Sequence, residues 1–183
     1  KTKVFIGIAR AGNVIGGGDW SEDRLIPDCM KSWSKNKKAM IRNPQSTRPW
    51  QHVLEAIGGY LLFAISIKKN KKLHGEAFNF GPSNSNNYQV IHLVKLMKKY
   101  WKKISWKVVN KNKNKFYESN LLKLNCNKAK TYLRWKSILS FKETIYMVTS
   151  WYKNYYSQPK KIYETSFEHI KEYEKLLKKR LFK

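Results

Sequence analysis

Residues 9–20 read Ala-Arg-Ala-Gly-Asn-Val-Ile-Gly-Gly-Gly-Asp-Trp, and this stretch decides the fold class. An apolar run rich in β-branched residues, 4–9, leads into it and predicts a buried strand. A loop holding four glycines follows, Gly12 and the run 16–18. In an open α/β sheet, ligands bind beyond the carboxyl ends of the strands. The loop is therefore a candidate ligand-binding edge.

Only three residues precede this strand in the sequence. A fully buried parallel strand has a neighbour on each side. We therefore expect the chain to be the later part of a larger sheet. It would carry a binding edge without the strands that complete the sheet.

The rest of the chain alternates between short apolar runs and stretches of helical periodicity, which predicts the α/β class. A polar stretch with two prolines, 42–52, predicts a loop. The paired glycines Gly58 and Gly59 predict a helix that packs closely against another element. Strands are expected at 39–41, 77–80 and 104–109, and helices at 23–36, 53–67, 88–102, 127–133, 141–156 and 168–183. The last of these is expected to be solvated or loosely docked.

Composition indicates a folded chain with an unusual charge. The 183 residues are 42% hydrophobic, which excludes a disordered chain, and the net charge is +26. Only six of the 38 basic residues are Arg, whereas proteins that read nucleic-acid sequence rely on Arg. We favour a Lys-rich solvated surface and expect no specific nucleic-acid partner. A non-catalytic module that binds polyanions remains the alternative.

Other function classes find little support in the sequence. No apolar run has transmembrane length, so we expect no membrane partner and a cytoplasmic location. The two cysteines, Cys29 and Cys126, are expected to be reduced. The four histidines are scattered without zinc spacing, so no metal is expected. Neither a G-x-G-x-x-G motif nor a phosphate-binding P-loop is present.

Three polar side chains are candidate ligand-binding groups, each with a structural alternative. The planar guanidinium of Arg48 suits bidentate capture of a diphosphate, but an ion pair to Glu55 or Asp19 fits equally well. Asn79 lies in an apolar strand end and serves either a ligand or the backbone. Asn13, beside the glycines, can both donate and accept.

Several loop motifs taken together resemble the CDP-glucose 4,6-dehydratases, which belong to the extended short-chain dehydrogenase/reductase group. They lie in one colinear order at residues 9–20, 23–28, 41–53, 59–64, 75–82 and 151–152. The resemblance implies an α/β fold made of the C-terminal part of a Rossmann-type NAD(P)-binding domain plus a small nucleotide-sugar-binding domain. Residues 1–20 would end the Rossmann-type domain, 21–156 would be mostly substrate-binding with segments returning to the Rossmann sheet, and 157–183 would be a charged helical tail.

The resemblance also implies ligands and roles. NAD would be the cofactor and CDP-glucose the substrate, in a protein that is a homo-oligomer at full length. Cofactor contacts would come from Ala11, Gly12 and Val14. Substrate contacts would come from Asn13, Arg24, Leu25, Pro27, Ile41, Arg42, Arg48 and Asn79.

The chain also departs from the family pattern. The family's glycine-rich NAD loop, catalytic Thr/Asp/Glu group and Tyr-x-x-x-Lys pair are expected upstream, so no catalytic residue is assigned to this chain. We therefore expect it to be inactive alone, and an inactive remnant remains possible. Asn125 stands where the family usually has Asp, Arg134 where it has Gly, and Tyr117 where His is common.

Overall fold

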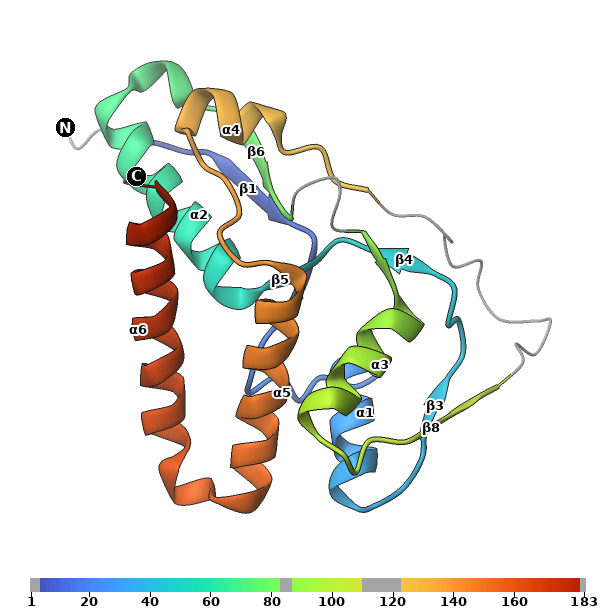
Figure 1. Ribbon diagram of the computed structural model, residues 1–183. Coiled ribbons are helices and arrows are strands. Elements are labelled where there is room, and N and C mark those ends of the chain that lie inside the picture. Colours follow the sequence, from blue (N-terminus) through green and yellow to red (C-terminus); the bar gives the residue numbers. More distant parts are fainter. Residues whose placement is uncertain (1–3, 83–86, 110–122, 182–183) are drawn as a thin grey trace.

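Two pairs of parallel strands form the centre of the fold (Figure 1). The computed structural model describes residues 4–82, 87–109 and 123–181. β1 (Ile8–Ala11) pairs with β6 (Ala77–Phe80), and β2 (Asn13–Ile15) pairs with β5 (Trp50–His52). The chain leaves β1 and enters β2 through the single residue Gly12. The two pairs therefore meet at the glycine-rich segment.

Helix α2 (Val53–Lys69) provides the crossover that parallel strands require. Its buried side chains Phe63 and Ile67 pack into a cluster with Phe78 and Phe80 of β6. A Cβ atom at Gly59 would lie 2.4 Å from the Phe80 ring, so this helix approaches the strand at a distance that only glycine allows. The close packing expected from the glycine pair is therefore confirmed.

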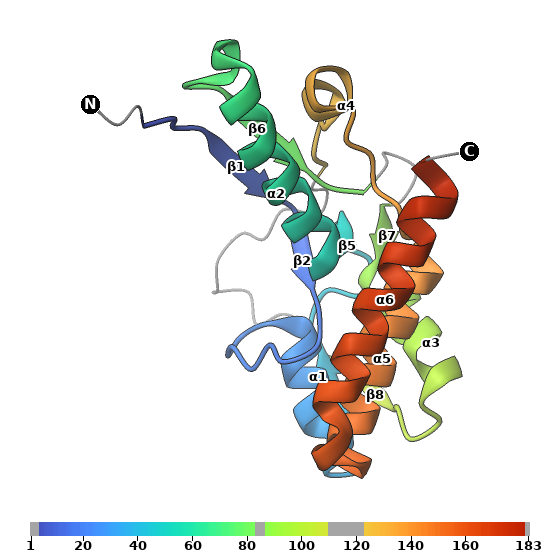
Figure 2. The same cartoon turned by 90° about the vertical axis from the view of Figure 1, so that its left-hand side faces the viewer.

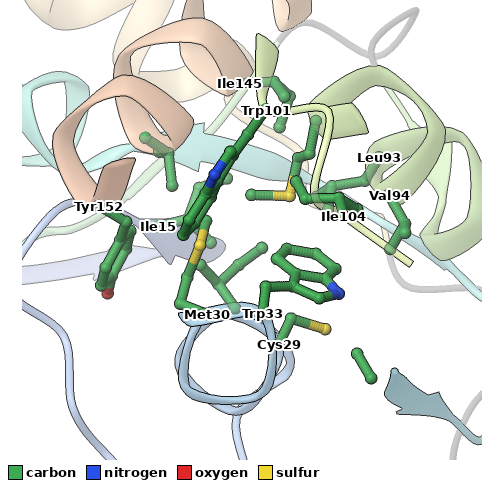
Figure 3. Packing of buried hydrophobic residues seen from close by; sticks show 14 of the residues in the cluster. Ile15, Cys29, Met30, Trp33, Leu93, Val94, Trp101, Ile104, Ile145 and Tyr152 are labelled. Carbon is green, nitrogen blue, oxygen red and sulfur yellow. The ribbon is translucent and has the colours of Figure 1, made fainter. Parts of the chain in front are cut away.

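A second and larger core lies between helices α1 (Leu25–Ser34), α3 (Val90–Tyr100) and α5 (Phe141–Ser157). Trp33 and Met30 of α1 are fully buried and face Leu93 of α3 and Ile145 of α5 (Figure 3). Two short sheets border this core. β3 (Ala39–Ile41) pairs with β8 (Trp106–Val108) in parallel, and β4 (Thr47–Arg48) pairs with β7 (Tyr88–Gln89) in antiparallel orientation.

The structure corrects several expected boundaries. The first strand begins at Ile8, later than expected, and three of its four residues are exposed rather than buried, because among the described strands it pairs only with β6. The stretch 42–52, expected to be a loop, contains β4 and β5, because backbone pairing with β7 and β2 overrides its proline-rich composition. The run Lys-Asn-Lys-Asn-Lys at 111–115, whose composition predicts an exposed basic loop, lies outside the described residues.

The expected solvated or loosely docked terminal helix is a docked one. α6 (Ile162–Leu181) follows a 3₁₀ turn, η3 (Pro159–Lys161), and lies along α5 (Figures 1 and 2). It begins six residues earlier than expected. Its Tyr173 is buried, and the Arg180 guanidinium pairs with Glu143 of α5 at 2.7 Å. This pairing lowers the pKa of Glu143 to about 2. Among the described residues, no helix combines the length and apolar character needed to cross a membrane.

Helix α4 (Asn127–Leu133) ends on Arg134, which has a φ of 53° and a ψ of 24°. This is the left-handed conformation in which glycine is favoured at a helix end. The position is also one where the resemblance leads us to expect Gly. Arg134 therefore occupies a backbone conformation that is strained for a side chain with a Cβ atom.

Replacing Arg134 with glycine is expected to raise the unfolding free energy by about 1 kcal/mol, because the left-handed strain disappears. For a chain of this size, the midpoint of thermal unfolding should rise by about 3 °C. Calorimetry on the Arg134→Gly and Arg134→Ala variants tests this. Arg134→Ala keeps the Cβ atom and should not gain stability. An equal gain in both variants would assign the effect to lost charge instead.

Candidate functional site

The carboxyl ends of β1 and β6 meet the segment that joins β4 to β5. The amide of Gly12 donates to the carbonyl of Phe80 at 3.3 Å. A Cβ atom at Gly12 would lie 3.1 Å from the Pro49 ring, so the backbone at this point touches the residue after Arg48. Asn13 then pairs in register with Trp50. The fold thus brings the surroundings of Asn13, Arg48 and Asn79 to one edge, as expected for a ligand site in this class of sheet.

Arg48 is held in place by its strand. It lies on β4 opposite Tyr88, is only 8% exposed, and donates from Nη1 to the carbonyl of Thr47 at 2.8 Å. The two acidic residues considered as alternative partners have other partners. Asp19 pairs with Arg24 at 3.1 Å, and Glu55 accepts from Ser137 at 3.2 Å. The guanidinium is therefore positioned by packing as well as by charge.

Asn79 has a backbone partner. Its side-chain nitrogen donates to the carbonyl of Asn125 at 3.0 Å. Asn125 in turn accepts from the amide of Asn127 at 2.9 Å, at the start of α4. Of the two roles considered for Asn79, contact with a ligand or with the backbone, its side-chain nitrogen therefore has the second. The same contact places Asn125, one of the departures from the family pattern, beside this candidate residue.

Gln51 is a residue of this edge that the sequence reasoning missed. It is 2% exposed on β5, and its Nε2 donates to the Phe80 carbonyl at 2.7 Å. Within the part of the chain that the structure describes, its Oε1 is the buried side-chain atom without a hydrogen-bond partner. A buried unpaired acceptor is costly unless a water or a ligand satisfies it. The only signal in the sequence was a polar residue between two aromatic ones, in a stretch expected to be a loop.

The residues expected to border a nucleotide lie around the start of α1 and on β3. Arg24 precedes α1 and pairs with Asp19, and the Arg42 guanidinium lies 3.7 Å from Asp23. Leu25 is half-buried, whereas the side chains of Pro27 and Ile41 are buried. A ligand there would meet the two guanidinium groups, Leu25 and the backbone of Ile41, but not the Ile41 side chain.

The residues expected near a nicotinamide lie at the same edge as Asn13. Ala11 ends β1, Gly12 follows it, and Val14 is on β2. All three are partly buried. The lack of a side chain at Gly12 allows Pro49 to pack against the backbone there, so this glycine serves the contact between β1 and the segment before β5.

Two buried ionisable groups lie at the start of α2 and have structural partners. His52 accepts at Nδ1 from the amide of Leu54 and so caps the helix. Burial, with a smaller contribution from His169, lowers the pKa of His52 to about 4, so the ring is neutral at pH 7. Burial raises the pKa of Glu55, although four donors surround its carboxylate. Both groups stabilise the join between α2 and its neighbours.

Cysteine and metal chemistry are not supported by the described residues. Both cysteines are free, and burial raises the pKa of the Cys29 thiol to about 12, which makes it a poor nucleophile. In residues 4–82, 87–109 and 123–181, no group of three or more metal-ligating side chains comes together. The arrangement of cationic and amide groups suits anion binding rather than proton transfer.

Comparison with known proteins identifies a relative of the chain. The chain is 41% identical over 151 residues to CDP-glucose 4,6-dehydratase from Salmonella typhimurium, a match that covers 82% of the chain. The chain is a relative of CDP-glucose 4,6-dehydratase. It spans 42% of that protein's length, which is consistent with a C-terminal portion. The resemblance inferred from the loop motifs is confirmed. No family model matches the chain.

Solved structures confirm the Rossmann-type α/β fold. UDP-glucuronic acid 4-epimerase from Bacillus cereus, in complex with UDP-glucuronic acid and NAD, is 18% identical with a TM-score of 0.65, over 82% of this chain and 46% of its own. dTDP-glucose 4,6-dehydratase from Bacillus anthracis, in complex with NAD, is 19% identical with a TM-score of 0.64, over 85% and 47%. These identities are too low to transfer ligands, so the likeness shows the fold alone. The chain corresponds to about half of each of these proteins.

Proposed function

We propose that this chain supplies the nucleotide-sugar side of a CDP-glucose 4,6-dehydratase. The observation that carries the proposal is the 41% identity to the Salmonella enzyme over four-fifths of the chain. The geometry supports it, because the motifs at 9–20, 41–53 and 75–82 meet at the carboxyl ends of β1 and β6. The whole enzyme would convert CDP-glucose to CDP-4-keto-6-deoxyglucose and water.

Each candidate side chain would bind a different part of the nucleotide sugar. Arg48 would hold the diphosphate with its planar fork of donors. Asn13 and Asn79 would add amide contacts to the phosphates and the sugar. Arg24 and Arg42 would border the nucleotide. The unpaired Oε1 atom of Gln51 would accept a hydrogen bond from a ligand hydroxyl or an ordered water.

NAD, when bound, would accept a hydride from the sugar and later return it. Ala11, Gly12 and Val14, which lie together at the end of β1 and the start of β2, would contact its nicotinamide end. This chain would orient the sugar against that ring. The groups that move protons would belong to the rest of the enzyme, since the arrangement here is cationic and amide in character.

An exposed apolar face suggests where the rest of the enzyme would join. Ile8 of β1 is 55% exposed and Leu61 of α2 is 61% exposed, and Ile6 and Ile65 are exposed with them. A parallel strand is ordinarily covered on both faces and paired on both edges, whereas β1 pairs only with β6 among the described strands. Ile6 and Ile8 point away from α2, because Gly7 between them faces Phe63, whereas Leu61 and Ile65 lie on the outer side of α2. We call the outer side of β1, with Ile6 and Ile8, the β1 face. It would receive the preceding part of the Rossmann sheet.

The second candidate function, polyanion binding, rests on the net charge of +26. Charge alone gives weak binding that salt removes. The site at the strand ends gives a different expectation, because positioned amides and a buried guanidinium can distinguish one anion from another. Salt dependence and selectivity therefore separate the two functions.

We expect the chain to bind CDP-glucose in a titration calorimeter at physiological salt, and to bind glucose 1-phosphate more weakly. The nucleoside diphosphate supplies contacts that the monophosphate lacks. We also expect no 4-keto sugar from CDP-glucose and NAD with this chain alone. Equal affinity for CDP-glucose, inorganic diphosphate and DNA, lost together as salt rises, would favour the polyanion module instead. Formation of 4-keto sugar by the isolated chain would contradict the assignment of the proton-transfer groups to the rest of the enzyme.

A further inference from the structure

Helix α6 has two apolar faces, and the fold buries only one of them. The inner face carries Thr165, Tyr173 and Leu176 and packs toward α5 and α2. On an adjoining side of the helix Tyr163 is 80% exposed and Phe167 is 48% exposed, and Ile170 and Leu181 are exposed as well. These residues follow the end of the candidate site's motifs and take no part in the proposed function.

The outward residues have the spacing of a coiled-coil seam. Positions 163, 167, 170, 174, 177 and 181 alternate in steps of four and three over the whole helix. This pattern places all six on one line along a helix and is typical of helix-to-helix packing. Leu177 borders the inner face, is half-buried and packs in part against the cluster around Tyr173, and Glu174 is the polar member. We call the apolar members, Tyr163, Phe167, Ile170, Leu177 and Leu181, the outer stripe.

The charges of α6 run from acidic to basic along the helix. Four of the chain's twelve acidic residues lie on it, at 164, 168, 172 and 174, and its last turns carry Lys175, Lys178, Lys179 and Arg180. A chain with net charge +26 thus has one helix that is nearly neutral and polarised. Two such helices attract each other when they run antiparallel and repel when they run parallel.

We propose that the outer stripe is a self-association surface on which a second copy of the chain docks its own α6 in antiparallel orientation. A helix of 20 residues is about 30 Å long, so the seam extends over nearly three heptads. Antiparallel overlap brings Tyr163 to the second copy's Leu181, and Phe167 to the second copy's Leu177. Glu164 and Lys178 flank the seam on the same side and meet across the two-fold axis. At the centre, Glu174 supplies a counter-charge for the two Lys171 side chains.

A lipid surface fits the outer stripe less well than a second copy. Amphipathic helices that lie on anionic membranes carry a basic polar face. Here Glu174 interrupts the stripe, and Glu164 and Glu168 lie on the flank that would face the lipid headgroups. These carboxylates would be repelled by anionic lipids but are used by an antiparallel partner helix.

The first test is sedimentation of the full chain over low to high micromolar concentrations. We expect a monomer–dimer equilibrium that weakens at least tenfold in the double variant Phe167→Glu, Ile170→Glu, a loss of about 1.4 kcal/mol or more. Glu is a good helix former and both sites are exposed, so circular dichroism should show an unchanged helix. The matched control is Leu61→Glu, Ile65→Glu, which makes the same change on the exposed outer side of α2 and should leave the dimer intact.

The second test exchanges two charges and so determines whether the two α6 helices run antiparallel. Glu164→Lys and Lys178→Glu should each weaken the dimer, and the two changes together should restore it, because the pair meets across the antiparallel axis. A chain that stays monomeric at every concentration overturns the proposal, and so does one that binds phosphatidylserine vesicles while monomeric. A dimer that survives the Phe167, Ile170 change but is lost with Leu61, Ile65 also overturns it. Failure of the double exchange to restore the dimer overturns the antiparallel arrangement.

Discussion

Replacing Glu55 with alanine is expected to lower the unfolding free energy of the chain by about 3–5 kcal/mol and the unfolding midpoint by about 10 °C. Glu55 is fully buried in the first turn of α2. Its Oε1 accepts from the amides of Ile138 and Leu139, at 2.7 Å for Ile138, and from Ser137. Its Oε2 accepts from the Tyr173 hydroxyl at 3.2 Å. Truncation leaves two buried backbone donors without an acceptor, which is the costly kind of loss.

The matched control is Glu55→Gln, which keeps an oxygen for the two amides. It should cost far less than Glu55→Ala. The comparison also has a pH signature. Because burial raises the folded pKa of Glu55 above the ordinary value of 4.5, the native state holds the extra proton between those two values. Wild-type stability therefore falls as pH rises through that interval.

Glutamine does not titrate, so the stability of Glu55→Gln relative to the wild type should improve as pH rises above 4.5. Chemical denaturation of the three proteins at several pH values measures all of this. Equal losses for Glu55→Ala and Glu55→Gln would show that the carboxylate charge matters, rather than its role as an acceptor. A loss below about 1 kcal/mol in Glu55→Ala would show that water replaces the carboxylate.

Glu55 also shows where sequence reasoning reached its limit. Its partners lie 82 to 118 residues away in the chain, and no local sequence pattern predicts contacts between residues so far apart. From the sequence, Glu55 was only a possible partner for Arg48. The same contacts fix α6, because Tyr173 reaches Glu55, and Arg180 donates to the Ile138 carbonyl as well as to Glu143. The tail was expected to be loose because its anchors are few, specific and distant in sequence.

The parts that could be predicted follow local rules. The Gly58–Gly59 pair and the helical spacing of α3 each depend on neighbouring residues, and each has the predicted form. The apolar run before the glycines was predicted as a buried strand over 4–9, but the strand covers 8–11 and is mostly exposed. β4 and β5 could not be predicted, since their strand character comes from pairing with β7 and β2 across the fold. Gln51 was missed for that reason, because its burial depends on β5, a strand that the local sequence does not predict.

Arg48 could be predicted only in part from the sequence. Its type and its loop motif pointed to a diphosphate, and the fold adds that the side chain is buried on β4, next in sequence to the Pro49 that contacts Gly12. The buried position makes a structural role a serious alternative. Binding and stability must therefore be measured on the same variants.

If Arg48 holds the substrate diphosphate, Arg48→Ala should weaken CDP-glucose binding by at least tenfold. The loss should exceed a hundredfold if the guanidinium donates two hydrogen bonds to the diphosphate. Each charge-assisted hydrogen bond contributes about 1.5–3 kcal/mol, and every 1.4 kcal/mol is about tenfold in Kd. Arg48→Lys should recover only part of the affinity, because a point charge does not reproduce the planar fork. Calorimetric titration of CDP-glucose into each variant measures these losses.

Two controls separate this role from charge and from folding. Arg134→Gly removes one unit of positive charge on α4 and should leave the CDP-glucose Kd within a factor of about two, as expected when a distant exposed charge is screened by salt. Cytidine, which lacks the diphosphate, should bind the wild type and Arg48→Ala equally well. A structural role for Arg48 predicts the reverse: a lower unfolding midpoint in Arg48→Ala with unchanged CDP-glucose affinity in the folded fraction. An unaltered Kd would remove Arg48 from the site and leave Asn13 and Gln51 as the groups positioned to meet the ligand at the strand ends.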